Sequence, residues 1–361
     1  MNQKPFDYAI LGAGSIGCYT GGWLASNGHR VLLIGRARIL STLEKQGLEL
    51  ESVDAKTTHL NVVNPKSGDV EKSNELAVGS VAISESADDL SNCQNILVAV
   101  KSAGSDEAAN QIQKFAARGS AVVSLQNGLG AARILKEGLP DHLVFAGMVT
   151  YNVVRQGNHF RQSTSGPISI ELPRDAAMAQ IARGIADDLN ASGIETFLRS
   201  DIENVQWSKL LLNLNNGINA LAGIPIRQML SDRNYRRIIA ACMQEALGIY
   251  RAAGIKMVRL GKIIPGIAPT VLKLPDFLFF RVASTMINID PTAMTSLAQD
   301  LIAARTTEID FLNGEIVRLA RSKGLRAPIN SSIVQLVKDA EESGQGSPEL
   351  SAEELKSRLE L

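Results

Sequence analysis

Short apolar runs alternate with helix-like segments through the first half of the chain. Runs that predict buried strands span residues 8–11, 31–34, 95–100, 121–125 and 144–148. This alternation is typical of a largely parallel sheet with helices on both faces. Residues 48–63 predict a β-hairpin broken near 52–56, and residues 150–172 predict extra strands, paired antiparallel, that finish the sheet. The first half is therefore predicted to be an α/β domain.

From about residue 201 the pattern changes to long helical periods. The predicted helices span residues 202–217, 233–253, 292–323 and 329–342. A helix over 176–192 and a short run at 195–198 precede the change, which places the domain boundary near residue 198. We expect an α/β domain over 1–198, an all-helical domain over 199–342 and a polar tail over 343–361. Within the tail, Ser351-Ala-Glu-Glu354 either caps a last short helix or belongs to a frayed end.

A glycine motif follows the first apolar run. Gly12, Gly14 and Gly17 form Gly-x-Gly-x-x-Gly, with Ser15 and Ile16 between the last two glycines. The first glycine allows a tight turn, the second lets a pyrophosphate approach the backbone, and the third lets the helix pack on the strand. The N-terminus of that helix offers N–H groups to phosphate. This order of strand, turn, helix and strand predicts a Rossmann-type dinucleotide-binding domain, although a tight turn that binds nothing has the same pattern.

The end of the second apolar run distinguishes between the two nicotinamide cofactors. Arg36 stands there, Arg38 follows, and the chain has no carboxylate between residues 31 and 43. An acidic residue would bind the ribose 2′-hydroxyl of NAD, whereas arginine accommodates a 2′-phosphate. The sequence therefore favours NADP(H), the alternative being that both arginines are solvated loop residues.

Composition excludes several classes of protein. Lysine and arginine total 37 among 361 residues and aspartate and glutamate also total 37, so the net charge is zero. This balance argues against a general nucleic-acid or membrane surface. Three scattered cysteines and four histidines without ligand spacing predict neither a disulfide scaffold nor a metal site. The opening residues carry no signal-peptide pattern and no apolar run has membrane-spanning length, so a cytoplasmic enzyme is expected.

A lysine among apolar residues is the first candidate for chemistry. Lys209 lies on the predicted helix 202–217, and Asn213 and Asn216 fall within about 40° of it on a helical wheel. An ammonium beside a pocket can act as a general acid, and burial lowers its pKa. The alternative is a lysine that snorkels from a helix end. Three asparagines within residues 213–216 favour a polar function, because asparagine is a poor residue for a helix interior.

A second polar group follows in residues 306–314. Ser296, Asp300 and Glu308 recur at intervals that fit one broad face of the predicted helix 292–323. A glutamate on a helix is usually solvated, so this pattern alone does not single out Glu308.

Taken together, these motifs resemble the ketopantoate reductase (2-dehydropantoate 2-reductase) family. The resemblance spans residues 7 to 340 and includes a serine twelve residues before the glutamate. The matching motifs are Gly12-Ala-Gly-Ser-Ile-Gly17, Val100-Lys101-Ser102, Gln126-Asn127-Gly128, Trp207-Ser-Lys209-Leu with Asn213, and Thr307-Glu308-Ile-Asp-Phe-Leu-Asn-Gly314.

The resemblance implies a role for each of these positions. Lys209 would donate a proton to the C2 carbonyl oxygen of the substrate while the nicotinamide delivers hydride to C2. Glu308 would hydrogen-bond the substrate hydroxyl and help to hold Lys209. Lys101 and Asn127 would position cofactor and substrate near the hinge. The residues that would orient the substrate are Asn213, Asn216 and Ser296.

The chain also departs from the family pattern. Position 217 is glycine where the family often has a second asparagine, so Asn215, Asn216 and Asn219 are all candidates, of which Asn216 keeps the helical face. Residues 254–291 are longer and more apolar than in compact members, which suggests a substrate lid, a subunit contact such as that of a homodimer, or an additional packed helix pair.

These features predict NADPH-dependent reduction of 2-dehydropantoate to pantoate, a step toward pantothenate. The substrate, a small 2-oxo acid, is expected in the cleft between the domains. Two alternatives stay open: a related reductase of another 2-oxo acid or carbonyl compound, and a nucleotide-binding sensor without turnover.

Overall fold

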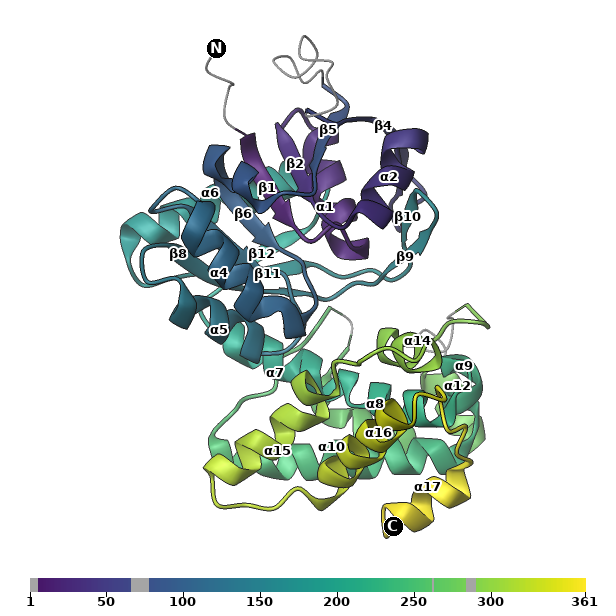
Figure 1. Cartoon of the computed structure of the whole chain (residues 1–361). Coiled ribbons are helices and arrows are strands. Elements are labelled where there is room, and N and C mark those ends of the chain that lie inside the picture. Colours follow the sequence, from purple (N-terminus) through teal and green to yellow (C-terminus); the bar gives the residue numbers. More distant parts are fainter. Residues whose placement is uncertain (1–5, 66–77, 262, 284–289) are drawn as a thin grey trace. The chain divides into compact units, whose positions relative to one another are not determined.

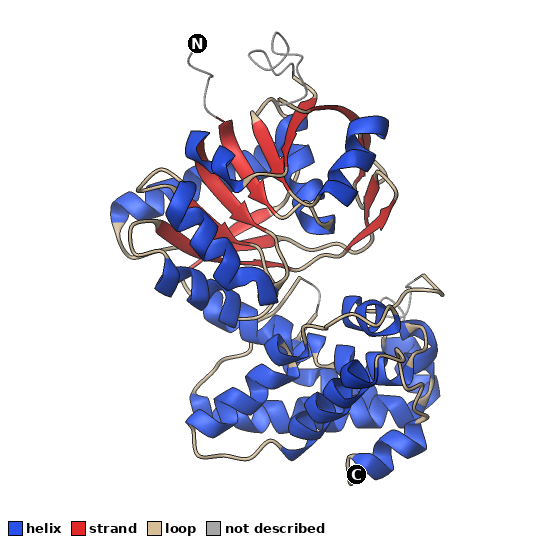
Figure 2. Cartoon of the chain, in the orientation of Figure 1, coloured by secondary structure: helices blue, strands red, loops and turns tan. Residues whose placement is uncertain are grey.

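The protein divides into two compact units. The structure, a computed structural model, describes residues 6–65, 78–261, 263–283 and 290–361. The first unit covers Met1–Ile202 and the second Glu203–Leu361. Figure 1 colours them from purple to teal and from green to yellow, and Figure 2 shows that the named strands belong to the first unit.

A twelve-stranded sheet is built by the described residues of the first unit. Its order is β12-β11-β8-β7-β6-β1-β2-β5-β4-β3-β10-β9. The strands are β1 (Phe6–Leu11), β2 (Val31–Ile34), β3 (Leu48–Glu51), β4 (Thr57–Val63), β5 (Ser80–Ser84), β6 (Cys93–Val98), β7 (Ala121–Ser124), β8 (Leu143–Val149), β9 (Val153–Gln156), β10 (His159–Gln162), β11 (Ile168–Glu171) and β12 (Thr196–Arg199).

The centre of this sheet is parallel. β1 pairs with β2 and β6, and β7 continues the parallel series to β8. The predicted hairpin is confirmed, because β3 and β4 pair antiparallel. The extra strands are present, but they separate. β11 pairs antiparallel with β8 as predicted, whereas the antiparallel hairpin of β9 and β10 lies near the opposite end of the sheet. There β10 pairs parallel with β3, so the antiparallel prediction is wrong for that pair.

Helices cover both faces of the sheet, as the alternation predicted. They are α1 (Ser15–Ser26), α2 (Ala37–Gln46), η1 (Ala87–Asn92), η2 (Ser102–Gly104), α4 (Ser105–Phe115), α5 (Gly130–Gly138) and α6 (Ala176–Ala191). Tyr8 and Ile10 of β1 share a core with buried residues of α1 and α6. Ala9 and Leu11 share the other core with buried residues of α4 and α5. Successive side chains of one strand thus enter opposite cores, which is why these strands are apolar throughout.

The second unit is helical around the long helix α10. Its elements are α7 (Ile202–Asn213), α8 (Asn215–Ala222), α9 (Ile226–Ser231), α10 (Arg233–Ala253), η3 (Pro265–Ile267), α11 (Ala268–Lys273), α12 (Asp276–Val282), α14 (Ser296–Ile302), η4 (Ile309–Phe311), α15 (Asn313–Ser322), α16 (Pro328–Ser343) and α17 (Ala352–Arg358). Helices α9, α11, α15, α16 and α17 all contact α10. The predictions for 233–253 and 329–342 are confirmed by α10 and α16.

Two helices that were predicted as continuous are interrupted in the structure. The helix over 292–323 is three separate pieces, α14, η4 and α15, because Ala304 adopts a left-handed φ of 50° that ends α14. Ser296, Asp300 and Glu308 therefore do not share one helix face. The helix over 202–217 is interrupted at Leu214, where α7 ends and α8 begins. Leu214 keeps helical dihedral angles, so the interruption is local.

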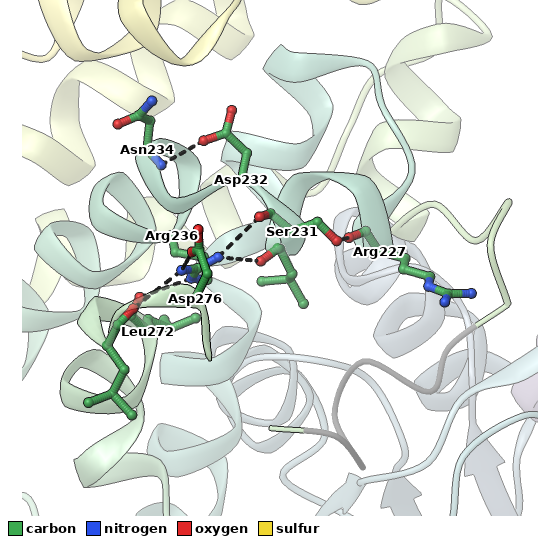
Figure 3. Close-up of polar contacts among 9 residues, drawn as sticks. Arg227, Ser231, Asp232, Asn234, Arg236, Leu272 and Asp276 are labelled. Atoms are coloured by element: carbon green, nitrogen blue, oxygen red, sulfur yellow. Dashed lines mark hydrogen bonds and ion pairs between the residues drawn. The ribbon is translucent and has the colours of Figure 1, made fainter. Parts of the chain in front are cut away.

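A buried arginine ties the segment 254–291 to α10. Arg236 has no exposed side-chain surface, and its guanidinium lies 4.1 Å from the ring centroid of Phe279. It pairs at 2.5 Å with Asp276, whose own side chain is 59% exposed (Figure 3). It also donates to the backbone carbonyls of Leu230, Ser231, Leu272 and Leu274. The described part of this segment thus contains a packed pair of short helices, α11 and α12.

The C-terminal tail is ordered rather than frayed. Ser351 and Glu354 form a capping box in which each side chain accepts from the other's backbone N–H. They begin α17, as one of the two sequence interpretations predicted.

Candidate active site

The glycine turn lies at the carboxyl end of β1, and its three glycines have different surroundings. Gly12 has a φ of 117°, and a Cβ there would lie 2.6 Å from the backbone carbon of Ala99. A Cβ on Gly17 would collide with the carbonyl oxygen of Gly12. A Cβ on Gly14 would meet nothing within 4 Å. Gly14 is also the N-cap of α1 and provides no side-chain cap. The turn therefore leaves open space beside a helix N-terminus, which fits a pyrophosphate group.

Arg36 lies next to this turn. It follows β2 and is the N-cap residue of α2, with an exposed side chain. The preceding Gly35 packs so closely on Ala13 that a Cβ at position 35 would lie 2.5 Å from the Cβ of Ala13. Arg36 is thus brought to the same edge of the sheet as the glycine turn, where a ribose phosphate would lie.

Two further loops meet at this edge, after β6 and β7. Lys101 and Asn127 are both exposed. The Ser102 hydroxyl donates to the backbone carbonyl of Asn127 at 3.0 Å. The buried amide of Gln126 donates to the Ser105 hydroxyl at 2.9 Å and to the Lys101 carbonyl at 3.4 Å. The sequence analysis quoted Gln126 without a role, and the structure shows that it ties together the loops carrying Lys101 and Asn127.

Lys209 belongs to the second unit, and its neighbours in the chain connect α7 to other segments of that unit. The ring of Trp207 meets that of Tyr250 edge-on, with centroids 5.1 Å apart. The Ser208 hydroxyl accepts the backbone N–H of Val258 at 2.9 Å. The Lys209 side chain is partly buried, and burial lowers the pKa of its amine from 10.5 to about 8. A lysine with this pKa exchanges its proton much closer to neutral pH than an exposed lysine does.

The four asparagines after Lys209 lie in different environments. Asn213 and Asn216 are partly exposed. Asn215 donates back to the carbonyl of Leu212 at 2.7 Å. Asn219 is fully buried, donates to the carbonyl of Ile224 at 2.7 Å and accepts the N–H of Thr295 at 3.0 Å. Because both amide atoms of Asn219 are used inside the protein, Asn216 is the better candidate for the second substrate asparagine.

Ser296 and Glu308 both approach α8 through their chain neighbours. Thr295, bonded to Asn219, is the N-cap of α14, and Ser296 follows it with an exposed side chain. Ile309, next to the partly buried Glu308, lies 3.1 Å from where a Cβ on Gly217 would stand. The segments that carry Ser296 and Glu308 therefore both contact helix α8.

The backbone before Glu308 is fixed by a residue to which the sequence analysis gave no role. Glu341 of α16 accepts the N–H of Thr307 at 2.7 Å, and the Thr307 hydroxyl accepts the N–H of Ile309 at 3.2 Å. Glu341 lies 34 residues from Thr307 in the chain, so no local pattern could indicate this contact.

Comparison with known proteins agrees with this geometry. The family model described as ketopantoate reductase PanE/ApbA matches residues 8–174, and its C-terminal counterpart matches residues 201–341. The chain belongs to the ketopantoate reductase family. It is therefore an oxidoreductase that acts on a ketone or alcohol.

Three of the similar proteins illustrate the range of this likeness. The 2-dehydropantoate 2-reductase of Pyrococcus horikoshii is 29% identical over 343 residues, which cover 94% of this chain and 98% of that protein. The crystal structure of a PanE/ApbA family ketopantoate reductase from Ralstonia eutropha has a TM-score of 0.74 at 27% identity, covering 94% of this chain and 99% of the other. D-mandelate dehydrogenase, solved with NADH and anilino(oxo)acetate, has a TM-score of 0.70 at 20% identity, covering 94% and 99%. At that identity it shares the fold alone.

In the described part of this ketopantoate reductase family member, no helix combines the length and the apolar character that spanning a membrane requires. Within the same residues, His, Cys, Asp and Glu side chains form no group of three or more that could hold a metal ion.

Proposed function

We propose that this protein reduces 2-dehydropantoate to pantoate with NADPH. Membership of the family supports the reaction class. The observation that carries the assignment to this chain is Lys209, a partly buried lysine with a pKa of about 8 in the helix that leads to Asn213 and Asn216. The proposal has two finer parts. The reaction is a step toward pantothenate, as the resemblance implies, and the enzyme is cytoplasmic, as expected from the sequence.

The nicotinamide cofactor supplies hydride for C2 of the substrate when it is bound. The first unit would hold it: the backbone at Gly14, Ser15 and Ile16 would bind the pyrophosphate, and Arg36 the 2′-phosphate. Asn127 and Lys101 would position its reactive end, since their loops are linked at the carboxyl ends of β6 and β7. Open space at Gly14 and the exposed guanidinium of Arg36 support this placement.

Lys209 would donate the proton that balances the hydride. As hydride reaches C2, negative charge develops on the carbonyl oxygen, and an ammonium group stabilises that charge and then transfers a proton to it. The products are the 2-hydroxy acid and the oxidised cofactor, and the amine of Lys209 is left neutral. Glu308 would hold the ammonium and the substrate hydroxyl, and Asn213, Asn216 and Ser296 would orient the rest of the substrate.

A spectrophotometric assay tests the activity. Purified protein, NADPH and 2-dehydropantoate are mixed, and oxidation of NADPH is followed against a panel of other 2-oxo acids. We expect 2-dehydropantoate to give the highest kcat/KM. If NADPH is oxidised with other 2-oxo acids but not with 2-dehydropantoate, the proposed substrate is contradicted. Binding of NADPH without turnover of any carbonyl compound would contradict an enzymatic function.

Replacing the proposed acid tests the mechanism. Lys209→Ala is expected to lower kcat by roughly 10²-fold or more, the usual scale for a lost general acid. Lys356→Ala, which removes an exposed lysine of α17, is the matched control and should leave kcat unchanged. Activity of Lys209→Ala within a few-fold of wild type would remove Lys209 from this role.

The choice of cofactor is tested at Arg36. Arg36→Ala should weaken binding of NADPH more than binding of NADH, because only NADPH has the 2′-phosphate. Lys45→Ala, an exposed basic residue in the last turn of the same helix, should affect neither. Equal losses for the two cofactors in Arg36→Ala would contradict the assignment.

A further inference from the structure

The buried side chain of Asn219 links helices α8 and α14. Asn219, in the last turn of α8, accepts the N–H of Thr295 at 3.0 Å and donates to the carbonyl of Ile224 at 2.7 Å. Thr295 in turn caps α14 by accepting the N–H of Ala298 at 3.2 Å. The N–H of Ile226 also bonds to the carbonyl of Ala293. The amide of Asn219 thus fixes the start of α14 against the end of α8.

Residues 344–361, here named the C-terminal arm, contact the same end of α8 as Asn219 and the opposite, C-terminal end of α14. The Ser347 hydroxyl donates to the carbonyl of Ala220 at 2.6 Å, and the N–H of Leu350 donates to the carbonyl of Leu221 at 2.8 Å. These are carbonyls in the last turn of α8, which have no partner within the helix. Gly346 packs on α14, where a Cβ would lie 3.2 Å from the carbonyl oxygen of Ile302. The arm therefore bridges the C-terminal ends of α8 and α14.

The arm is itself held on the central helix α10. The hydroxyl of Tyr235 donates to the carbonyl of Leu350 at 2.8 Å. Leu350 and Leu355 are buried, and α17 packs on α10. The match to the family model ends at residue 341, before the arm begins. The bridge between α8 and α14 is thus made by residues of this chain that the family model does not describe.

We propose that Asn219 and the C-terminal arm form a positioning device that sets the spacing between Asn216 on α8 and Ser296 on α14. This inference rests on the proposed function, in which both side chains bind the 2-oxo acid. Asn219 has no exposed surface and Ser347 contacts the backbone of α8, so both act through other residues. A small change in the spacing of two substrate-binding groups weakens binding even when the fold persists.

The arm is tested by a pair of serine substitutions. Ser347→Ala removes the hydrogen bond to the Ala220 carbonyl of α8 and a bond of 3.3 Å from the N–H of Glu349. Ser343→Ala is the matched control, because it removes a bond of 2.8 Å to the Ala340 carbonyl and one of 3.3 Å from the N–H of Gln345, neither of which involves α8. We expect Ser347→Ala to raise KM for 2-dehydropantoate about fivefold, the factor that one net hydrogen bond represents, with kcat changed less than about twofold. Ser343→Ala should leave KM unchanged, and Ser347→Thr, which keeps the hydroxyl, should restore it.

A merely structural role would give a different result. If Ser347→Ala lowers the melting temperature but leaves KM equal to that of Ser343→Ala, the proposal is overturned. It is also overturned if Ser347→Thr fails to restore KM.

The Asn219 half of the device is tested by a double-mutant cycle with Ser296. Asn219→Ala should raise KM about tenfold, since it removes contacts of both amide atoms. In a Ser296→Ala background the same change should raise KM much less, because its effect is transmitted through Ser296. Fully additive effects would overturn the proposal.

Hydrogen exchange separates this inference from the proposed function. Exchange of the Thr295 amide is measured without any substrate in wild type, Ser347→Ala and Ser343→Ala. Faster exchange of this amide in Ser347→Ala, but not in Ser343→Ala, supports the coupling between the arm and α14. Equal exchange in the two variants overturns it. An inactive wild-type protein would contradict the proposed function, and the exchange result would still decide whether the device exists.

Discussion

At the scale of single residues, the same amino acid has different tasks at neighbouring positions. Gly12 adopts a left-handed φ, Gly17 has the carbonyl oxygen of Gly12 where its Cβ would be, and Gly14 faces open space. The motif already predicts a different task for each of the three glycines. The structure adds the surroundings of each, and these distinguish Gly12 and Gly17, where a Cβ would collide with backbone, from Gly14, where a Cβ would meet nothing.

This difference predicts opposite effects of two substitutions. Gly17→Ala should destabilise the protein by about 1–3 kcal/mol, the usual cost of overpacking, because the new Cβ collides with Gly12. Gly14→Ala should melt close to wild type but bind NADPH at least about tenfold more weakly, since its methyl group occupies the space proposed for the pyrophosphate. Thermal denaturation and fluorescence titration with NADPH measure the two effects. Unaltered NADPH binding by Gly14→Ala would contradict the placement of the cofactor.

Lys209 predicts the pH dependence of the reaction. Reduction requires the protonated amine, and burial lowers the pKa of that amine to about 8. The amine is therefore protonated below pH 8 and loses its proton above it, so kcat/KM for reduction should fall about tenfold per pH unit above this value. Oxidation of the hydroxy acid requires the neutral amine and should rise over the same range. A reduction rate that stays constant to pH 10 would be inconsistent with Lys209 as the acid.

At the scale of elements, the helices are fixed by partners that are distant in the chain. α10 has the bounds that its periodicity predicted, because its own apolar face specifies it. The predicted helix 292–323 has a comparable pattern, yet it breaks where Ala304 turns left-handed and where Glu341 binds the backbone of Thr307. Helical periodicity therefore predicted the helix that packs along its whole length and failed where a tertiary contact replaces helical hydrogen bonds.

Arg236 provides a test at this scale. Arg236→Met should lower the free energy of unfolding by about 3 kcal/mol or more, because it leaves buried carbonyl groups of α9 and α11 without donors. Asp276→Asn should cost about 1 kcal/mol or less, since its carboxylate is 59% exposed. Arg237→Met, at an exposed neighbouring position of α10, is the matched control. Urea denaturation compares the three variants, and equal losses for Arg236→Met and Arg237→Met would show that Arg236 does not hold this segment.

At the scale of the whole molecule, the proposed cofactor-binding residues and the proposed acid belong to different units. The glycine turn, Arg36, Lys101 and Asn127 lie in the first unit, and Lys209 lies in the second. Each unit has its own helices and buried residues, so a ligand of one unit stabilises that unit directly.

Ligand-dependent stability should reveal this division. NADPH at a hundred times its Kd should stabilise the protein by about 2.7 kcal/mol. In hydrogen exchange, the strongest protection is expected at residues 12–17 and at the loops after β2, β6 and β7. Gly14→Ala at the same NADPH concentration should reduce both effects, whereas Lys356→Ala should not. Protection concentrated in α10 and α16 would contradict a cofactor site on the first unit.

Features that short-range chemistry specifies could be predicted from the residues alone. The apolar runs predicted the central strands, and the glycine motif predicted the tight turn at the end of β1. The same local signals gave the antiparallel pairing of residues 48–63 and the bounds of α10.

Features that depend on which distant segments meet became visible in the three-dimensional structure. Tertiary packing placed β10 beside β3, broke the helix before Glu308 and directed the amide of Asn219 toward Thr295 instead of the solvent. Asn216 and Asn219 are three residues apart and read alike in the sequence. They differ in the structure because burial and hydrogen-bond partners are set by the packing of distant segments, and no residue pattern within a single helix contains that information.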